Sequence, residues 1–258
     1  MTTGIKITVT LLSGALLLGS MNFTAVATPS HAVSELGMKK TTLSTKGGTE
    51  GEQLERAEQE RIAQLLEKNP DDTYMVYVSK EITNQKAAKV YSMGNPFPKF
   101  DSYEAYQKKA STLKGTVLEQ PAVLPEGYQF VSAGIAGPYS TEYTKEMETE
   151  AKKLGKKIYS KKIEWTIANE IVIEYSNGKH TLSLGYKRLD PKQPVKQNGY
   201  FYESAEEVRK KYPMLKEKNI FNTLSWSEKG KQLTITTDSE SPLTKEELIK
   251  LGKSMVKK

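Results

Sequence analysis

The residue in this sequence with the clearest capacity for acid–base chemistry is His180. The chain contains only two histidines, and the other, His31, lies close to the N-terminus. A serine hydrolase needs a histidine between a serine and an acid, so a triad in the body of the chain would have to use His180. His180 follows Asn177-Gly178, a dipeptide typical of hairpin turns. We expect it to lie on the surface opposite Tyr175, which favours a structural role over catalysis.

Other catalytic motifs are incomplete. Ser-x-x-Lys begins at Ser111, Ser176 and Ser254, but the Ser-Asp-Asn and Lys-Thr-Gly elements that accompany it in penicillin-interacting enzymes are missing. The sequence has no cysteine, which excludes a thiol nucleophile, a thiolate metal site and disulfides. It also has no calcium loop, P-loop or dinucleotide fingerprint. We therefore expect no catalytic residues, no metal site and no cofactor.

A lysine cluster is the strongest candidate binding feature. Six lysines fall within eleven residues: Lys152, Lys153, Lys156, Lys157, Lys161 and Lys162. They straddle the expected end of a helix, where cations complement the helix dipole. This lysine cluster is expected either to contact a phosphate-rich envelope polymer or to form a solvated, charged edge.

The first 32 residues indicate where the protein works. Lys6 precedes an apolar run, Ile7 to Leu18, and small residues suited to cleavage stand at Ala25–Ala27 and Ser30–Ala32. This order is typical of a secretory signal peptide. The alternative is an uncleaved anchor, because a membrane span needs about 20 apolar residues and the moderately apolar stretch extends to Ala27. Either way, the remaining chain is expected to be secreted or to lie on the extracytoplasmic face of the cell envelope.

The charge balance limits the classes of partner. The formal net charge is +7 at pH 7. Because little nucleic acid is present outside a cell, a nucleic-acid partner is not expected, and an envelope protein or an anionic wall polymer fits better. Contact with the membrane is expected only through the N-terminal segment, when that segment is uncleaved.

The sequence divides into four parts. Residues 1–32 form the signal peptide or anchor, and residues 33–51 form a flexible tether without an apolar period. Residues 52–100 combine a charged helix with a β-hairpin, whose strands are expected near 74–78 and 89–93. Residues 101–258 form a larger α+β domain.

Helices in the larger domain are predicted from their caps and apolar faces. One begins at Asp101, a second covers about 141–154, and two more begin after Ser204 and Thr244, each followed by glutamate at capping-box spacing. Tyr200-Phe201-Tyr202 is predicted to pack in the core, since it would otherwise form an exposed recognition patch.

Two hairpins are predicted from their turns. Folding about Asn177-Gly178 pairs Ile173 with Leu182, and folding about Lys229-Gly230 pairs Trp226 with Leu233. Each pairing places apolar residues on one face and polar residues on the other. The sequence therefore predicts an α+β fold, in which an antiparallel β-sheet has helices packed on one face.

Several segments of this domain resemble a known family. They are the turn Leu124-Pro125-Glu126-Gly127-Tyr128, the strands around Trp226 and Leu233–Ile235, and the capped segment Leu243–Lys250. From about Ser102 onward the chain resembles domain of unknown function 4367, found in exported or membrane-anchored proteins of Gram-positive bacteria. The resemblance implies a location and a fold, and it supplies no catalytic residues.

These observations favour a non-enzymatic module that binds or senses a protein partner or an anionic envelope polymer. One alternative is a carrier of a hydrophobic ligand, which would need an apolar cavity of about 300 Å³ or more. A second alternative is a hydrolase, which would depend on His180 or on a pair of acids in a cleft.

Overall fold

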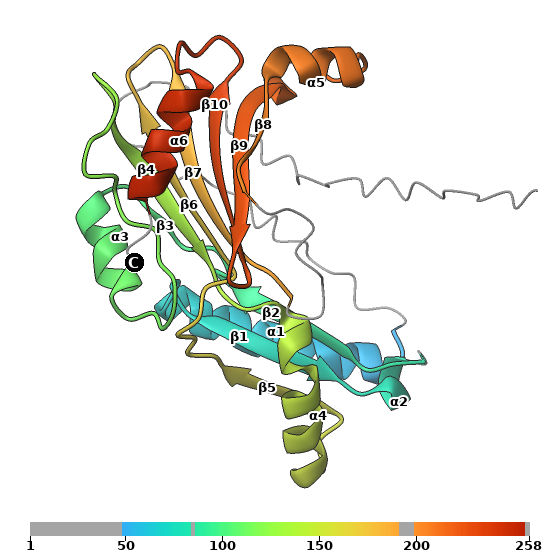
Figure 1. The fold of residues 1–258 in the computed structure, drawn as a ribbon. Helices are drawn as coiled ribbons and strands as arrows, with labels where there is room; N and C mark the ends of the chain where they lie inside the picture. The colour runs from blue at the N-terminus through green and yellow to red at the C-terminus, as the bar shows by residue number, and fades with distance from the viewer. Residues whose placement is uncertain (1–47, 84–85, 191–198, 256–258) are drawn as a thin grey trace, which may run out of the picture. The chain divides into compact units, whose positions relative to one another are not determined.

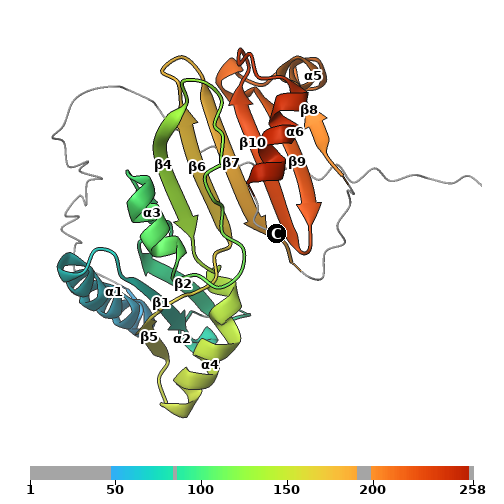
Figure 2. The ribbon, with the colours of Figure 1, turned by 60° about the vertical axis from the view of Figure 1, so that its left-hand side comes forward.

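Two antiparallel β-sheets and six α-helices make up the part of the chain that the computed structural model describes, residues 48–83, 86–190 and 199–255 (Figures 1 and 2). The predicted α+β class is therefore confirmed. The predicted signal peptide and most of the predicted tether lie outside the described residues. Among the helices that are described, none is long and apolar enough to cross a membrane.

The smaller sheet contains three strands in the order β2-β1-β5. The predicted hairpin is present, with β1 at Thr73–Val78 and β2 at Lys89–Gly94. A short helix, α2 (Lys80–Thr83), lies between them in sequence. On its other side β1 pairs with β5 (Ile158–Lys162), so this sheet draws its strands from both sides of residue 100.

Strand β1 is buried at all six positions because helices pack on both of its faces. Helix α1 (Glu50–Lys68) supplies Ile62, which packs against one row of β1 side chains. Helix α4 (Thr144–Lys153) supplies Met147, which packs against the other row. A one-turn 3₁₀ helix, η1 (Ser140–Tyr143), leads into α4.

The larger sheet contains seven strands in the order β3-β4-β6-β7-β10-β9-β8. Their bounds are Lys99–Phe100 for β3, Gln129–Ala136 for β4, Glu170–Ser176 for β6, Thr181–Arg188 for β7, Phe201–Glu203 for β8, Phe221–Glu228 for β9 and Lys231–Asp238 for β10. Every neighbouring pair is antiparallel.

Helices α3 (Tyr103–Ala110) and α6 (Lys245–Ser254) cover one face of this sheet (Figures 1 and 2). Tyr106 of α3 and Leu248 of α6 belong to the same buried cluster as Ile173, Leu184 and Leu233 of the strands. The alternating strand residues on the other face are polar or partly exposed. The predicted one-sided covering is confirmed.

The hairpin about Lys229-Gly230 has the predicted register. Trp226 pairs with Leu233, and Leu224 pairs with Ile235. Lys229 has φ +46° and Gly230 has φ +78°, the positive pair that a two-residue hairpin turn with right-handed strand twist requires.

The hairpin after β6 exists, but its predicted register is wrong by two residues. Ile173 pairs with Leu184, and Tyr175 pairs with Leu182 rather than with His180. The Asn177 side chain accepts hydrogen bonds from the backbone N–H groups of Lys179 and His180, which widens the turn to four residues. A shift of two residues leaves every side chain on its predicted face, so the apolar face stays buried.

Helix starts follow the predicted caps, with one correction. Thr244 and Ser204 each form a reciprocal capping box with the glutamate three residues later, and they begin α6 and α5 (Ala205–Lys211). The cap of α3 is Ser102 rather than Asp101, because the Ser102 hydroxyl accepts a hydrogen bond from the Ala105 N–H at 3.2 Å.

Candidate binding surface

The predicted lysine cluster is a real feature of the surface, but acidic side chains neutralise much of it. Lys152 and Lys153 end α4, Lys156 and Lys157 lie in the connection that follows, and Lys161 and Lys162 belong to β5. Four of these six lysines have a carboxylate oxygen within 4 Å of the ammonium nitrogen.

Lys161 is the most strongly paired member of the lysine cluster. Its ammonium group contacts Glu146 and lies 2.8 Å from a Glu150 oxygen, both on α4. Burial acts to lower the pKa of Lys161, but its hydrogen bonds to the two glutamates outweigh that effect, and the pKa is raised overall. These bonds link β5 to α4, so this lysine has a structural use.

The other members of the cluster are more exposed. Lys152 pairs with Glu148 at 2.8 Å, Lys162 pairs with Asp72 at 2.7 Å, and Lys157 lies 3.7 Å from Glu81. Lys156 stands over the Tyr159 ring, 5.9 Å from its centroid, and Lys153 is exposed. A polyanion would have to compete with these acids for most of the lysine cluster.

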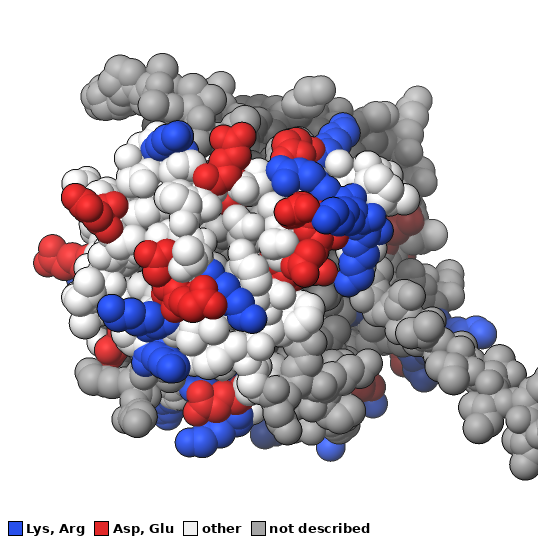
Figure 3. All heavy atoms as spheres, turned by 45° about the horizontal axis from the view of Figure 1, so that its top comes forward, with Lys and Arg blue, Asp and Glu red and all other residues white. Residues whose placement is uncertain are grey.

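A mixture of charges is also seen on another face of the molecule. In Figure 3, acidic and basic side chains lie next to one another, and no large area of one sign is visible on the face in view. Such mixing weakens long-range attraction of a polyanion.

The expectation that His180 lies on the surface is wrong. His180 is 7% exposed, and its Nδ1 lies 3.0 Å from Asp238 Oδ1. Asp238 Oδ2 also accepts a hydrogen bond from the Thr181 N–H at 2.9 Å. The histidine therefore holds the turn after β6 to the end of β10. Sequence reasoning missed Asp238 because it lies 58 residues along the chain, and no motif marks it.

Of the serines considered for catalysis, Ser176 lies near this pair. Its hydroxyl donates to the His180 carbonyl oxygen at 3.0 Å, which is a turn contact rather than an approach to the imidazole ring. Within the described part of the chain, no group of three or more histidine, aspartate or glutamate side chains is placed to hold a metal ion.

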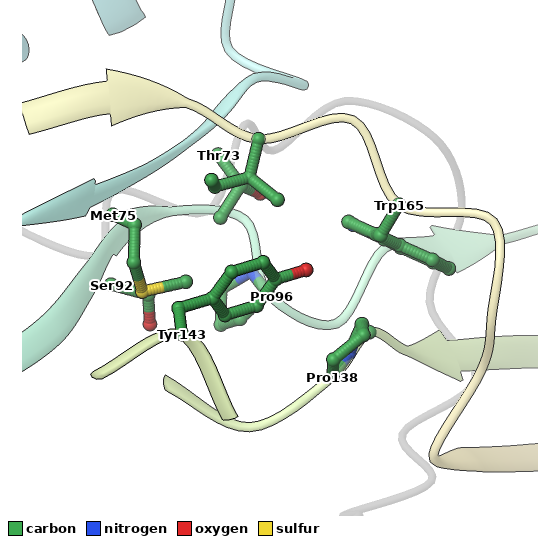
Figure 4. A pocket seen from close by; sticks show the side chains of 9 residues that line it. Thr73, Met75, Ser92, Pro96, Pro138, Tyr143 and Trp165 are labelled. Atoms are coloured by element: carbon green, nitrogen blue, oxygen red, sulfur yellow. The ribbon is translucent and has the colours of Figure 1, made fainter. Parts of the chain in front are cut away.

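A small cavity lies where the β1–β2 hairpin meets the segments around Pro138 and Trp165 (Figure 4). Its volume is about 20 Å³, room for a single water molecule. Met75 and Trp165 border it on opposite sides in Figure 4. A second hollow, along the outer side of α3, is open to solvent and is lined mainly by polar residues such as Ser102 and Gln107. Neither hollow has the form of an enclosed apolar site of about 300 Å³ that a lipid carrier would need.

The aromatic triplet Tyr200-Phe201-Tyr202 at β8 is only partly buried, although it was predicted to pack in the core. Tyr202 packs against the main core cluster, as predicted. Tyr200 and Phe201, however, are 39% and 44% exposed. The Tyr200 ring rests on Trp226, with ring centroids 5.2 Å apart, which holds it beside the sheet. We call Tyr200 and Phe201 the β8 edge surface.

The β8 edge surface stands at the end of the larger sheet. Strand β8 is the last in the sheet order and pairs with β9 alone among the described strands. Phe201 pairs with Ser225, so it lies on the face opposite to the core, whereas the Tyr200 ring rests on the core-side residue Trp226. The two aromatic side chains therefore border the β8 edge from opposite faces of the sheet. An edge with exposed aromatic residues is chemically suited to bind a protein chain.

Comparison of the sequence with protein-family models found no match, and a search of curated proteins found none.

Proposed function

We propose that this protein is an exported, non-enzymatic module of the cell envelope that binds another protein through the β8 edge surface. The N-terminal pattern of Lys6, the apolar run and the small-residue cleavage positions supports export. The resemblance of the region from about Ser102 to domain of unknown function 4367 supports the same location.

The exposure of Tyr200 and Phe201 is the observation that carries the proposal. Aromatic residues and arginine dominate the binding energy of protein interfaces, and they do so from well-packed central positions. Tyr200 is already ordered by Trp226, so binding would cost little further side-chain entropy. Strand β8 is short, so backbone pairing with a partner strand would add few bonds and the aromatic side chains would supply most of the affinity.

A protein partner fits these observations better than an anionic wall polymer. Binding of a polyanion depends on unpaired cations and falls as salt increases. Most of the lysine cluster already contacts carboxylates, whereas the β8 edge surface is apolar and exposed.

The proposal is tested by placing a photo-crosslinking phenylalanine analogue at position 201 in the full chain, expressed in its own host. We expect one defined protein adduct. Phe201→Ala should then weaken the affinity for that purified protein by about 2 kcal/mol, roughly 30-fold, because an aromatic anchor is lost. The matched control is Val131→Ala, an apolar residue of β4 that is 50% exposed, and it should leave the affinity unchanged.

The competing polymer hypothesis makes a different prediction. It predicts that the full chain sediments with isolated cell walls in a salt-sensitive manner and that the double variant Lys153→Glu, Lys156→Glu no longer sediments. If both results are found and Phe201→Ala has no effect on any binding, the proposed protein interface is wrong.

A further inference from the structure

The connection between β8 and β9 projects from the sheet and carries an unusual tip. It consists of α5, a loop and a short 3₁₀ helix, η2 (Glu217–Asn219). Ala205 is the only buried residue of α5, and every residue from Lys210 to Glu217 is exposed. Figure 1 shows α5 at the end of the larger sheet that carries β8 and β9.

Apolar side chains gather at this tip instead of turning inward. Tyr212, Met214 and Leu215 are 45%, 81% and 39% exposed. The loop has a defined turn, because the Leu215 N–H donates to the Tyr212 carbonyl oxygen at 3.0 Å. We call Tyr212–Leu215 the α5 tip. Exposed apolar residues gathered in this way usually mark a contact with a protein or a membrane.

Basic residues flank the α5 tip on both sides. Arg209, Lys210 and Lys211 precede it, and Lys216 and Lys218 follow it. Three of these cations pair with Glu217, Glu206 and Glu203. Over residues 203–219, which include all three of these acids, five basic and four acidic residues leave a net charge of +1.

We propose that the α5 tip inserts into the headgroup region of an anionic lipid bilayer. Tyrosine prefers the interface between lipid and water, and lysine can extend its ammonium group to the headgroups while its methylenes contact acyl chains. Phosphate headgroups complement the positive charge around the tip. This contact uses a different element from the β8 edge surface and goes beyond the proposed protein binding.

A bilayer fits this tip better than a second protein. Met214 protrudes from a loop, and a protein could bury it only in a matching pocket, whereas lipid adapts to its shape. A bilayer would also lie nearby in the alternative in which the N-terminal apolar run stays uncleaved and anchors the chain.

The absence of cysteine allows a direct test with the full chain. Met214→Cys creates a unique thiol, which is labelled with an environment-sensitive fluorophore. We expect a blue shift, a severalfold rise in emission and quenching by brominated lipids on addition of vesicles of phosphatidylcholine with phosphatidylglycerol. Vesicles of phosphatidylcholine alone should produce little change. Because the label reports only on position 214, insertion of the N-terminal segment does not by itself give this signal.

Two variants control the experiment. Leu154→Cys places the same label at a residue of similar type, 55% exposed and on a different part of the fold, and it should give no shift. Lys216→Glu in the Met214→Cys background should weaken partitioning into the anionic vesicles by roughly tenfold.

The proposal is overturned if the label at position 214 stays in water with anionic vesicles, or if labels at positions 214 and 154 shift equally. A shift at position 214 only after addition of the partner captured through Phe201 would assign the tip to that protein instead. Failure to find a protein partner at the β8 edge surface would leave the vesicle result standing, so the two proposals fail separately.

Discussion

Individual residues in this protein take their roles from partners distant in sequence, and Asp238 is the clearest case. Its carboxylate accepts hydrogen bonds from the N–H groups of Thr181 and Glu240 and lies 3.0 Å from His180 Nδ1. Burial acts to raise the pKa of Asp238, but the hydrogen bonds from His180 and Thr181 outweigh it, and the pKa falls below its ordinary value of 3.8. A carboxyl group whose pKa is lowered by folding stabilises the folded state when it is ionised.

We therefore predict that Asp238→Asn lowers the free energy of unfolding at pH 7 by about 1.5 kcal/mol, because charge-assisted hydrogen bonds are replaced by weaker ones. The stabilisation by Asp238 is fully present above its unfolded pKa and is lost as pH falls through the lower folded value. Urea unfolding at several pH values should show the difference between wild type and variant shrinking below about pH 4.

Asp71→Asn, at an exposed position after α1, is the control for loss of one carboxylate. A destabilisation by Asp238→Asn that stays constant down to pH 2 would show that the ionised carboxylate is not the source of the effect.

At the scale of elements, helix α6 is specified mainly by its own sequence. The Thr244 hydroxyl accepts from the Glu247 N–H, and the Glu247 carboxylate accepts from the Thr244 N–H at 2.8 Å. The helix then buries Leu248, Leu251 and Met255 against the larger sheet. The cap and the apolar face therefore support the same helix start.

For this element we predict that Thr244→Ala lowers the free energy of unfolding by about 1 kcal/mol, because one backbone donor at the helix start loses its acceptor. Thr244→Ser keeps the hydroxyl and should stay close to wild type. Denaturant titrations of both variants measure the effect, and equal stability of the alanine and serine variants would contradict it.

At the scale of the whole molecule, a polar network joins the η1–α4 segment to the larger sheet. The Asn169 amide donates to Glu142 at 2.9 Å and accepts from Arg188 Nε at 2.6 Å, and Arg188 also pairs with Glu142. Asn169 is 1% exposed. Burial acts to raise the pKa of Glu142, but hydrogen bonds from Arg188 and Asn169 lower it overall. Since α4 packs on β1, this network couples the two sheets.

We predict that a double-mutant cycle with Glu142→Ala and Arg188→Ala gives a coupling energy of about 1 kcal/mol, since the pair shares a buried amide. The matched control is the pair Glu206 and Lys210, whose side chains are 73% and 74% exposed, and its coupling should be about 0.3 kcal/mol. Equal couplings from the two cycles in urea unfolding would show that the network adds nothing beyond a surface ion pair.

The sequence by itself determined the features that depend on neighbouring residues. The capping boxes at Ser204 and Thr244 were predictable because cap and acceptor lie three residues apart. The register about Lys229-Gly230 was predictable because a two-residue turn admits one pairing. The α+β class and the covering of the sheet on one face were predictable from the alternation of apolar and polar residues along each strand, which is also a local pattern.

Only the tertiary structure decided which distant segments meet. It paired β5 with β1, brought Asp238 to His180, and placed acids beside the lysine cluster. It also left Phe201 exposed at a sheet edge, although an aromatic triplet at this position was predicted to pack in the core. The register after β6, by contrast, is set by hydrogen bonds within the turn, which the Asn177 side chain accepts from Lys179 and His180. The contacts between distant segments depend on how the whole chain packs, which no short stretch of sequence encodes.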